Sequence, residues 1–292
     1  MDATVGGTKL VGQRHALSLI ESWKHNNTFP HFLLIAGDVG SGKKTMCYLI
    51  AQTIGCNVYK VEDISANSVR DVIMSAYSTY SPIIYLFPDA DKMSAAAKNS
   101  LLKLTEEPPD NAYIVITLQS LDNTLGTLRS RSQHIVMEEY SFDELKLLSD
   151  DDRLCKLAKT PGMLKRLMAM DKSAIDKIVD TADKLIRYID KVSFPNSLKS
   201  ANSIKFKEAD KGIEIDLFIA GLSYVLTNMI NEVMNAADKE TLFRLSCWTR
   251  ALCKYGSKFS YIGVNKKALY DMFILEVRNS LRGGVGHGFS GA

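Results

Sequence analysis

A glycine-rich stretch near the amino terminus has the composition and spacing of a loop that binds phosphate. It runs from Gly37 through Gly40 and Gly42 to Lys43, in the order Gly-x-x-x-x-Gly-Lys. Glycines let backbone N–H groups curl round a phosphate, the following helix adds its positive dipole, and the lysine reaches the terminal phosphates. Three glycines in register fit a plain glycine turn poorly. We therefore interpret residues 37–45 as a phosphate-binding loop, with ATP or ADP as its possible ligand.

The residues that should bind Mg²⁺ beside such a loop are replaced. The position after the loop lysine is normally Ser or Thr, whose hydroxyl binds the metal, but here it is Lys44. Thr45 lies one place later, about 100° further round the helix, and cannot simply substitute. A buried strand that should end in a metal-binding carboxylate ends instead in Pro88, followed by Asp89. We expect no metal site and little or no hydrolysis; Lys44 either offsets the missing charge or points to solvent.

The elements that must position this loop follow from the hydrophobic pattern of the first half of the chain. Short apolar runs alternate with helical periodicity, which is typical of a parallel α/β sheet. The predicted strands cover 32–36, 57–61, 83–87, 112–117 and 133–137. The predicted helices cover roughly 13–24, 42–54, 67–79 and 94–105. We therefore predict an α/β domain of the P-loop class over residues 1–137.

The second half of the chain has a helical pattern and no strand signal. Short helices are expected near 142–148, 151–158 and 162–170, with Ser141 and Asp150 as N-cap residues for the first two. Longer amphipathic helices are expected at 173–192, 213–237, 239–255 and 264–281, and a flexible glycine-rich tail from residue 283. We predict a small helical lid domain over 138–172 and an all-helical domain over 173–292.

Composition excludes several classes of protein. Of the 292 residues, 46% are hydrophobic and 24% charged, as in an ordinary soluble globular protein. The start of the chain has no signal-peptide pattern and no apolar run approaches the ~18 residues of a membrane span, so we expect a cytoplasmic protein with no membrane partner. Five cysteines without a Cys-x-x-Cys pair argue against a disulfide framework and against zinc.

The half of the chain that contains the phosphate loop has equal numbers of basic and acidic residues. Residues 1–137 hold 12 of the 36 Lys and Arg and 12 of the 33 Asp and Glu, so the net charge of +3 comes from the second half. Binding of nucleic acid through a general positive field needs a clear excess of Lys and Arg. If DNA is a partner, a few well-placed residues must contact it.

Three further motifs resemble the clamp-loader AAA+ proteins of bacterial DNA polymerase III. They are Val11-Gly12-Gln13, the run from Lys98 to Pro109 with its Leu-Leu-Lys-x-x-Glu-Glu-Pro-Pro pattern, and Thr127-Leu128-Arg129-Ser130-Arg131-Ser132. Within that family the chain looks most similar to the delta-prime subunit, which combines a degraded ATP site with an intact Ser-Arg motif. The resemblance implies an AAA+ domain, a lid and an all-helical collar that holds subunits in a ring.

The resemblance also implies roles for single residues. Arg131 would act as an arginine finger on the ATP of a neighbouring subunit, where such fingers contribute on the order of 10³–10⁵ in rate. Its motif follows the fourth strand, so we expect it at the opposite edge of the domain from the phosphate loop; the plain alternative is a surface pair with Glu138 or Glu139. Thr117 would match the first nucleotide sensor. Thr160-Pro161-Gly162 would match the arginine-free second sensor of delta-prime.

The partners implied are other clamp-loader subunits, a sliding clamp and primer-template DNA. Arg70, Lys98 and Lys103 would face the DNA and contact its phosphates, although ordinary exposed side chains explain these residues nearly as well. The leading interpretation is a stator subunit that hydrolyses ATP weakly or not at all. Two alternatives stay open: an active AAA+ ATPase in which Thr45 and Asp89 still bind Mg²⁺, and a scaffold that binds no nucleotide.

Overall fold

The chain divides into two compact units. The computed structural model describes residues 3–5, 8–189, 191–193, 195–196, 203–206, 212–236, 238–261 and 263–285. One unit comprises Met1–Asp150 with Thr160–Gly162, and the other Asp151–Lys159 with Met163–Ala292. The finer division into a lid over 138–172 and a collar over 173–292 stays a prediction.

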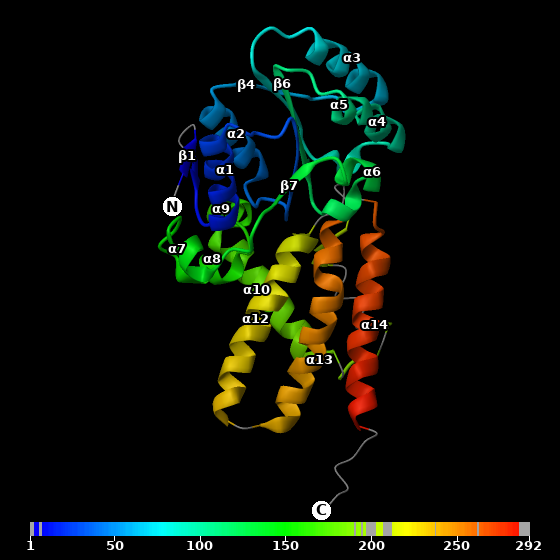
Figure 1. Ribbon diagram of the computed structural model, residues 1–292. Coiled ribbons are helices and arrows are strands. Elements are labelled where there is room, and N and C mark those ends of the chain that lie inside the picture. Colours follow the sequence, from blue (N-terminus) through cyan, green and yellow to red (C-terminus); the bar gives the residue numbers. More distant parts are fainter. Residues whose placement is uncertain are drawn as a thin grey trace, which may run out of the picture. The chain divides into compact units, whose positions relative to one another are not determined.

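A five-stranded parallel sheet forms the centre of the first unit (Figure 1). Its order is β4-β5-β6-β3-β7. The strands are β3 (Phe32–Ala36), β4 (Asn57–Lys60), β5 (Ile83–Phe87), β6 (Ala112–Leu118) and β7 (Gln133–Val136). The interior strand β3 pairs with β6 and β7, and Leu34 lies opposite both Ile116 and His134. All five residues of β3 are buried, as expected for a strand covered on both faces. The predicted α/β class is confirmed, and each predicted strand agrees to within one residue.

Helices cover both faces of this sheet and divide its core in two. Leu34 and Phe87 face α3 (Ala66–Tyr77), α4 (Ala95–Ser100), α5 (Leu102–Glu106) and α6 (Gly126–Arg129). Ile35 and Leu86, on the opposite face, pack against α1 (Arg14–Asn26) and α2 (Lys43–Ile54). Successive strand residues therefore alternate between the two cores, which is why the strands read as continuous apolar runs.

The first unit differs from the sequence-based expectation in three details. A short antiparallel hairpin, β1 (Ala3–Val5) with β2 (Thr8–Leu10), was not predicted. The helix expected over 94–105 is interrupted at Leu101, which ends α4 and precedes α5. Short 3-10 turns occupy Ala90–Lys92 (η1) and Leu121–Asn123 (η2). Ser141 caps α7 (Phe142–Lys146) in a capping box with Glu144, which confirms that prediction.

The second unit is helical. Its described helices include α8 (Asp152–Leu157), most of α9 (Pro161–Met168), α10 (Lys172–Tyr188), α12 (Ile215–Ala236), α13 (Lys239–Tyr255), the 3-10 turn η4 (Gly256–Ser260) and α14 (Lys266–Val285). The long helices α12, α13 and α14 lie side by side (Figure 1), and α10 packs on α12. Asp151, not Asp150, caps α8, because its side chain is the one that accepts the Leu154 N–H. A two-residue parallel pair, β8 (Ile204–Lys205) with β9 (Ile213–Glu214), corrects the expectation of no strand after Met137. The predicted tail lies outside the described residues from 286 onward.

One helix corrects the expectation about membrane-length segments. Among the described residues, Ile215–Met234 in α12 is long and apolar enough to cross a membrane by length and composition, with a mean hydropathy of 1.3. A core helix of a soluble protein passes the same test, so the finding is weak evidence. Here α12 packs against both α10 and α13.

Candidate functional site

The phosphate loop connects the carboxyl end of β3 to the start of α2. Gly40 and Gly42 have φ of +80° and +93°, a left-handed conformation that glycine adopts without strain. Lys43 is buried, and its Nζ donates to the carbonyls of Gly37 at 2.6 Å and Asp38 at 2.8 Å. Burial lowers the pKa of Lys43, and nearby carboxylates partly oppose this shift. The side chain that would meet a terminal phosphate is thus bound to its own loop.

The start of α9 covers the same loop from the other side. The Gly162 N–H donates to Gly40 O at 2.9 Å, and Thr160 Oγ1 donates to Val39 O at 3.1 Å. The backbones touch: a Cβ on Gly162 would lie 2.5 Å from Gly40 Cα. The protein's own chain therefore lies against the glycines that would cradle a phosphate.

Tyr140 and Leu10 contact the loop, and Gln13 holds the segment that leads to Tyr140. The Tyr140 hydroxyl donates to Ser41 O at 2.6 Å, and burial raises the pKa of Tyr140 to about 12. The buried Gln13 carboxamide pairs with the backbone of Glu138, donating to its carbonyl at 2.9 Å and accepting its N–H at 2.7 Å. A Cβ on Gly42 would come within 3.1 Å of Leu10. These contacts fix the segment after β7 against the loop.

Where a metal ion would sit beside the loop, the structure has an ion pair. Lys44 Nζ lies 3.2 Å from Asp89 Oδ2, and both side chains are about half exposed. The Asp89 N–H donates to Oγ1 of the fully buried Thr117 at 3.0 Å. The structure thus brings Lys44, Asp89 and Thr117 together, next to Pro88 at the end of β5. Lys44 lies at the position of the missing metal ligand.

These residues do not fit a bound Mg²⁺-nucleotide in this conformation. The loop is in backbone contact with Gly162, its lysine is hydrogen-bonded inward, and an ammonium group pairs with the carboxylate that would be needed by the metal. No catalytic step can be derived through a nucleotide held here. Among the described residues, no three His, Cys, Asp or Glu side chains gather as a metal-binding group.

Arg131 lies at the amino-terminal end of the strands. It precedes β7, whose Gln133 pairs with Leu33, and it lines a cavity of about 340 Å³ with Pro30 and Phe32 before and in β3. Because β7 is a direct neighbour of β3, no other strand lies between Arg131 and the strand that carries the phosphate loop. The separation runs along the strands: five residues of β3, about 16 Å, lie between this end and the phosphate loop.

The partners of Arg131 also differ from expectation. Its Nη1 donates to Thr127 O at 3.1 Å, and its Nη2 lies 3.6 Å from Glu106 Oε1. The plain alternative paired Arg131 with Glu138 or Glu139; among the described residues its acidic partner is Glu106. Arg129, two residues earlier, pairs with Asp122 at 2.9 Å. Arg131 stays 43% exposed at the side chain, so its guanidinium is accessible from outside the chain.

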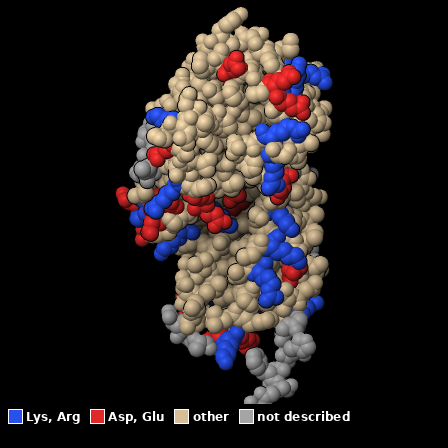
Figure 2. All heavy atoms as spheres, viewed as in Figure 1, with Lys and Arg blue, Asp and Glu red and all other residues tan. Residues whose placement is uncertain are grey.

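The three candidate DNA contacts have different surroundings. Arg70 is exposed on α3 and reaches only Asn67, at 3.5 Å. Lys103 is exposed on α5, with its ammonium 5.6 Å from the centre of the Tyr77 ring. Lys98 is half-buried and donates to Asn123 O at 2.6 Å. On the face drawn in Figure 2, the described Lys and Arg of the α/β unit are scattered among Asp and Glu and form no continuous basic surface.

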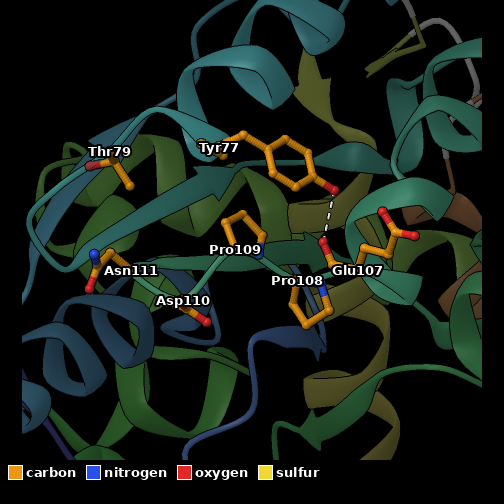
Figure 3. A pocket seen from close by; sticks show the side chains of 8 residues that line it. Tyr77, Thr79, Glu107, Pro108, Pro109, Asp110 and Asn111 are labelled. Carbon is orange, nitrogen blue, oxygen red and sulfur yellow. Dashed lines mark hydrogen bonds between the residues drawn. The ribbon is translucent and has the colours of Figure 1, made fainter.

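An exposed apolar surface lies at the end of α3. Met74, Tyr77 and Tyr80 are 70%, 41% and 96% exposed. Figure 3 shows Tyr77 reaching across a cavity of about 360 Å³ to the backbone of Glu107, with its hydroxyl 2.8 Å from the carbonyl oxygen. Pro108, Pro109, Asp110 and Asn111 line the same cavity. Exposed aromatic and methionine side chains are enriched where proteins bind one another.

The contacts that several residues of the site make were not predicted from the sequence. The contacts of Gln13, Tyr140 and Gly162 join segments about a hundred or more residues apart, so local spacing contains no signal for them. Gln13 and Gly162 belong to the motifs Val11-Gly12-Gln13 and Thr160-Pro161-Gly162, which were singled out in the sequence, whereas Tyr140 belongs to no such motif. Glu106 lies in the run from Lys98 to Pro109, and its position beside Arg131 was not foreseen.

Comparisons with known proteins identify proteins that are similar to this chain. A family model described as "DNA polymerase III, delta subunit" matches residues 59–141. The chain is 26% identical over 175 residues to DNA polymerase III subunit gamma of Buchnera aphidicola, covering 48% of each protein. It is 20% identical over 265 residues to subunit gamma/tau of Mycoplasma genitalium, covering 78% of the chain and 42% of the relative. The chain thus spans about half the length of these relatives.

A solved DNA polymerase III gamma subunit-related protein from Thermotoga maritima is also similar. It has 17% identity and a TM-score of 0.42, over 90% of this chain and 99% of the other. That score is too low for an argument, so the fold rests on the sheet order and the phosphate loop described above. The family model and the gamma-type relatives together support a bacterial clamp-loader AAA+ family, that of DNA polymerase III, for this chain.

Proposed function

We propose that the chain is a stator subunit of a bacterial clamp loader. It hydrolyses ATP weakly or not at all, and it supplies Arg131 as an arginine finger to the ATP site of a neighbouring subunit. The assembled complex loads a sliding clamp onto primer-template DNA in the cytoplasm. Its own site binds no Mg²⁺ and no zinc.

The closed phosphate loop is the observation that carries this proposal. The Gly162 backbone lies against Gly40, Lys43 is held by loop carbonyls, and Lys44 pairs with Asp89. A subunit of this form contributes to hydrolysis only through a neighbour. Arg131 suits that role because it is accessible and lies about 16 Å along the strands from its own loop.

The partners are assigned by surface chemistry. Exposed Met74, Tyr77 and Tyr80 at the end of α3 suit contact with a protein partner, and we assign the sliding clamp to this surface. Arg70 and Lys103 are the better candidates for DNA phosphates, because both are exposed. Lys98 is the weaker candidate, since the Asn123 carbonyl already binds its ammonium group.

One observation favours the alternative of an active ATPase. Ser41 Oγ in the phosphate loop is buried and is one of two buried side-chain polar atoms without a hydrogen-bond partner in the described chain. A phosphate or an ordered water would satisfy it. For this alternative, α9 would have to move off the loop and the shifted Thr45 and Asp89 would have to bind Mg²⁺.

ATP turnover tests the proposal. The isolated protein should show no Mg²⁺-dependent ATPase above background, and Pro88→Asp alone should not restore it, because position 44 still lacks a hydroxyl. In a complex reconstituted with the clamp-loader subunits of the same organism, Arg131→Ala should lower kcat by on the order of 10³ or more. The affinity of the partner for ATP should change far less, since the finger contacts charge that develops in the transition state.

Arg129→Ala is the matched control for this experiment, because Arg129 is exposed but pairs with Asp122 within its own chain. It should leave the ATPase of the complex unchanged. Turnover on the order of 1 s⁻¹ by the isolated protein, abolished by Lys43→Ala, would establish the active-ATPase alternative. An unchanged rate in the Arg131→Ala complex would remove the finger role and leave a scaffold.

A further inference from the structure

Glu106 approaches the guanidinium of Arg131 from a separate helix. It is the last residue of α5, whereas Arg131 follows Ser130, the C-cap residue of α6. The Arg131 Nη2 lies 3.6 Å from Glu106 Oε1, and Nη1 donates to Thr127 O at 3.1 Å. Two acceptors from different elements therefore hold the two terminal nitrogens of one side chain.

Local backbone structure fixes where each side chain begins. Helix α5 ends at Glu106 because Glu107 leaves the helical conformation (φ −129°, ψ 74°) and precedes Pro108, which disfavours helix at the residue before it. The Arg131 N–H donates to Leu128 O at 3.2 Å, so the backbone at Arg131 continues the turn of α6. Helices α5 and α6 pack against each other. The two side chains thus meet at the junction of two anchored helix ends.

We propose that Glu106 is a positioning residue for Arg131. With the Thr127 carbonyl, it restricts the guanidinium to one orientation at the subunit surface before a neighbour's ATP arrives. This inference rests on the proposed function, in which Arg131 acts on that ATP. A long flexible arginine loses rotamer freedom when it docks, and prior restriction reduces that entropy loss.

The geometry suits orientation without blocking the finger. An N–O distance of 3.6 Å is longer than the 2.7–2.9 Å of a full charge-assisted hydrogen bond. The guanidinium has five N–H donors, and the Thr127 carbonyl engages one of them. Both side chains are exposed, 43% for Arg131 and 59% for Glu106, so a phosphate from outside can reach the remaining donors.

The adjacent Glu107 provides a matched control. It has the same side chain, it is also exposed, and its backbone carbonyl accepts the Tyr77 hydroxyl in a different cavity. Among the ion pairs of the described residues, Arg131 has Glu106 as its partner and not Glu107. A general effect of removing one negative charge from this region would appear equally in Glu106→Gln and Glu107→Gln.

The test is steady-state ATP hydrolysis by the reconstituted complex. Glu106→Gln should lower kcat roughly 10-fold, since small misplacements of a positioned group cost up to about 100-fold, while KM for ATP stays within about twofold. Glu106→Asp should lower kcat less than Glu106→Gln does, and Glu107→Gln should have the kcat of the wild type. In an Arg131→Ala background, Glu106→Gln should have no further effect, because the group that it orients is gone.

Each of the other outcomes contradicts either the positioning role of Glu106 or the proposed function. If Arg131→Ala lowers kcat but Glu106→Gln does not, the positioning role is wrong and the proposed function stands. If Glu106→Gln raises kcat, Glu106 restrains the finger and the inference is overturned. An equal loss from Glu106→Gln with and without Arg131 would mean that Glu106 acts by another route. No effect of Arg131→Ala would instead remove the proposed function itself.

Discussion

Replacing Gly162 with alanine tests whether the start of α9 closes the phosphate loop. The added Cβ would lie 2.5 Å from Gly40 Cα and 3.0 Å from Gly40 O. Both are backbone atoms, which cannot rotate away as a flexible side chain would. Residue 162 must therefore move off the loop or remain in place under strain.

The expected loss in the free energy of unfolding can be worked out for each of these two responses. Movement would lose the bonds from Gly162 N–H to Gly40 O and from Thr160 Oγ1 to Val39 O, at about 1 kcal/mol each. Strain in place would cost about 1–3 kcal/mol, as overpacking does. Alanine stabilises a helix by up to about 1 kcal/mol relative to glycine, and this gain offsets part of the loss. The free energy of unfolding of the α/β unit should therefore fall by about 1–2 kcal/mol.

Urea unfolding followed by tryptophan fluorescence measures this change. The chain has two tryptophans, Trp23 in α1 of the α/β unit and Trp248 in α13 of the helical unit. In a Trp248→Phe background, the fluorescence of Trp23 reports on the α/β unit alone. Gly162→Ala should lower the urea midpoint of this signal without changing its slope.

Gly126→Ala is the matched control. Gly126 begins α6 in the same unit, and a Cβ there would meet no atom within 4 Å. This variant should be as stable as its parent or slightly more so, since alanine restricts the unfolded chain. Equal midpoints for Gly162→Ala and its parent would refute the close contact between α9 and the loop.

Three further predictions concern the groups around the loop. Tyr140 has a pKa of about 12 in the folded protein and near 10 once unfolded, so the unfolded chain loses its proton first. The free energy of unfolding should therefore fall as the pH rises from about 10 to about 12, and denaturation series should show that Tyr140→Phe removes this part of the pH dependence. If ADP binds, its affinity measured by calorimetry should not change when EDTA removes Mg²⁺, because Lys44 lies at the position of the metal ligand. A strong loss with EDTA would contradict this, and no ADP binding at all would favour the scaffold. Asp89→Asn should change the free energy of unfolding by about 1 kcal/mol or less, since it breaks a half-exposed ion pair, and a thermal melt that shows a larger loss would reveal a role beyond this pair.

The strands could be predicted because strands that are buried on both faces consist almost entirely of apolar residues. Ile83–Phe87 and Phe32–Ala36 are apolar throughout, and the structure confirms both ranges as strands covered on two faces. Helix interruptions were less predictable. The break at Leu101 falls in a continuous helical pattern, and Leu101 itself is fully buried, so its apolar character gave no sign of the break.

The position of Arg131 depended on strand order, which sequence patterns do not specify. The motif was expected at the opposite edge of the domain from the phosphate loop because it follows the fourth strand, and nothing in its spacing showed that β7 pairs with β3. In a parallel sheet the residues before one strand lie at the opposite end from those after its neighbour. Arg131 and the phosphate loop are therefore separated by the length of two adjacent strands, β3 and β7.

The sequence by itself determined the glycine pattern of the phosphate loop, the presence of Lys and Pro at positions 44 and 88, and the alternation that builds a parallel sheet. These features depend on residue type and short spacing, which local sequence specifies completely. Only the tertiary structure decided that Gly162 lies on Gly40, that Lys44 pairs with Asp89, and that Glu106 meets Arg131. Such contacts join segments separated by 25 to more than 100 residues, and a hydrophobic pattern specifies which face of an element is buried but not which distant residue packs against it.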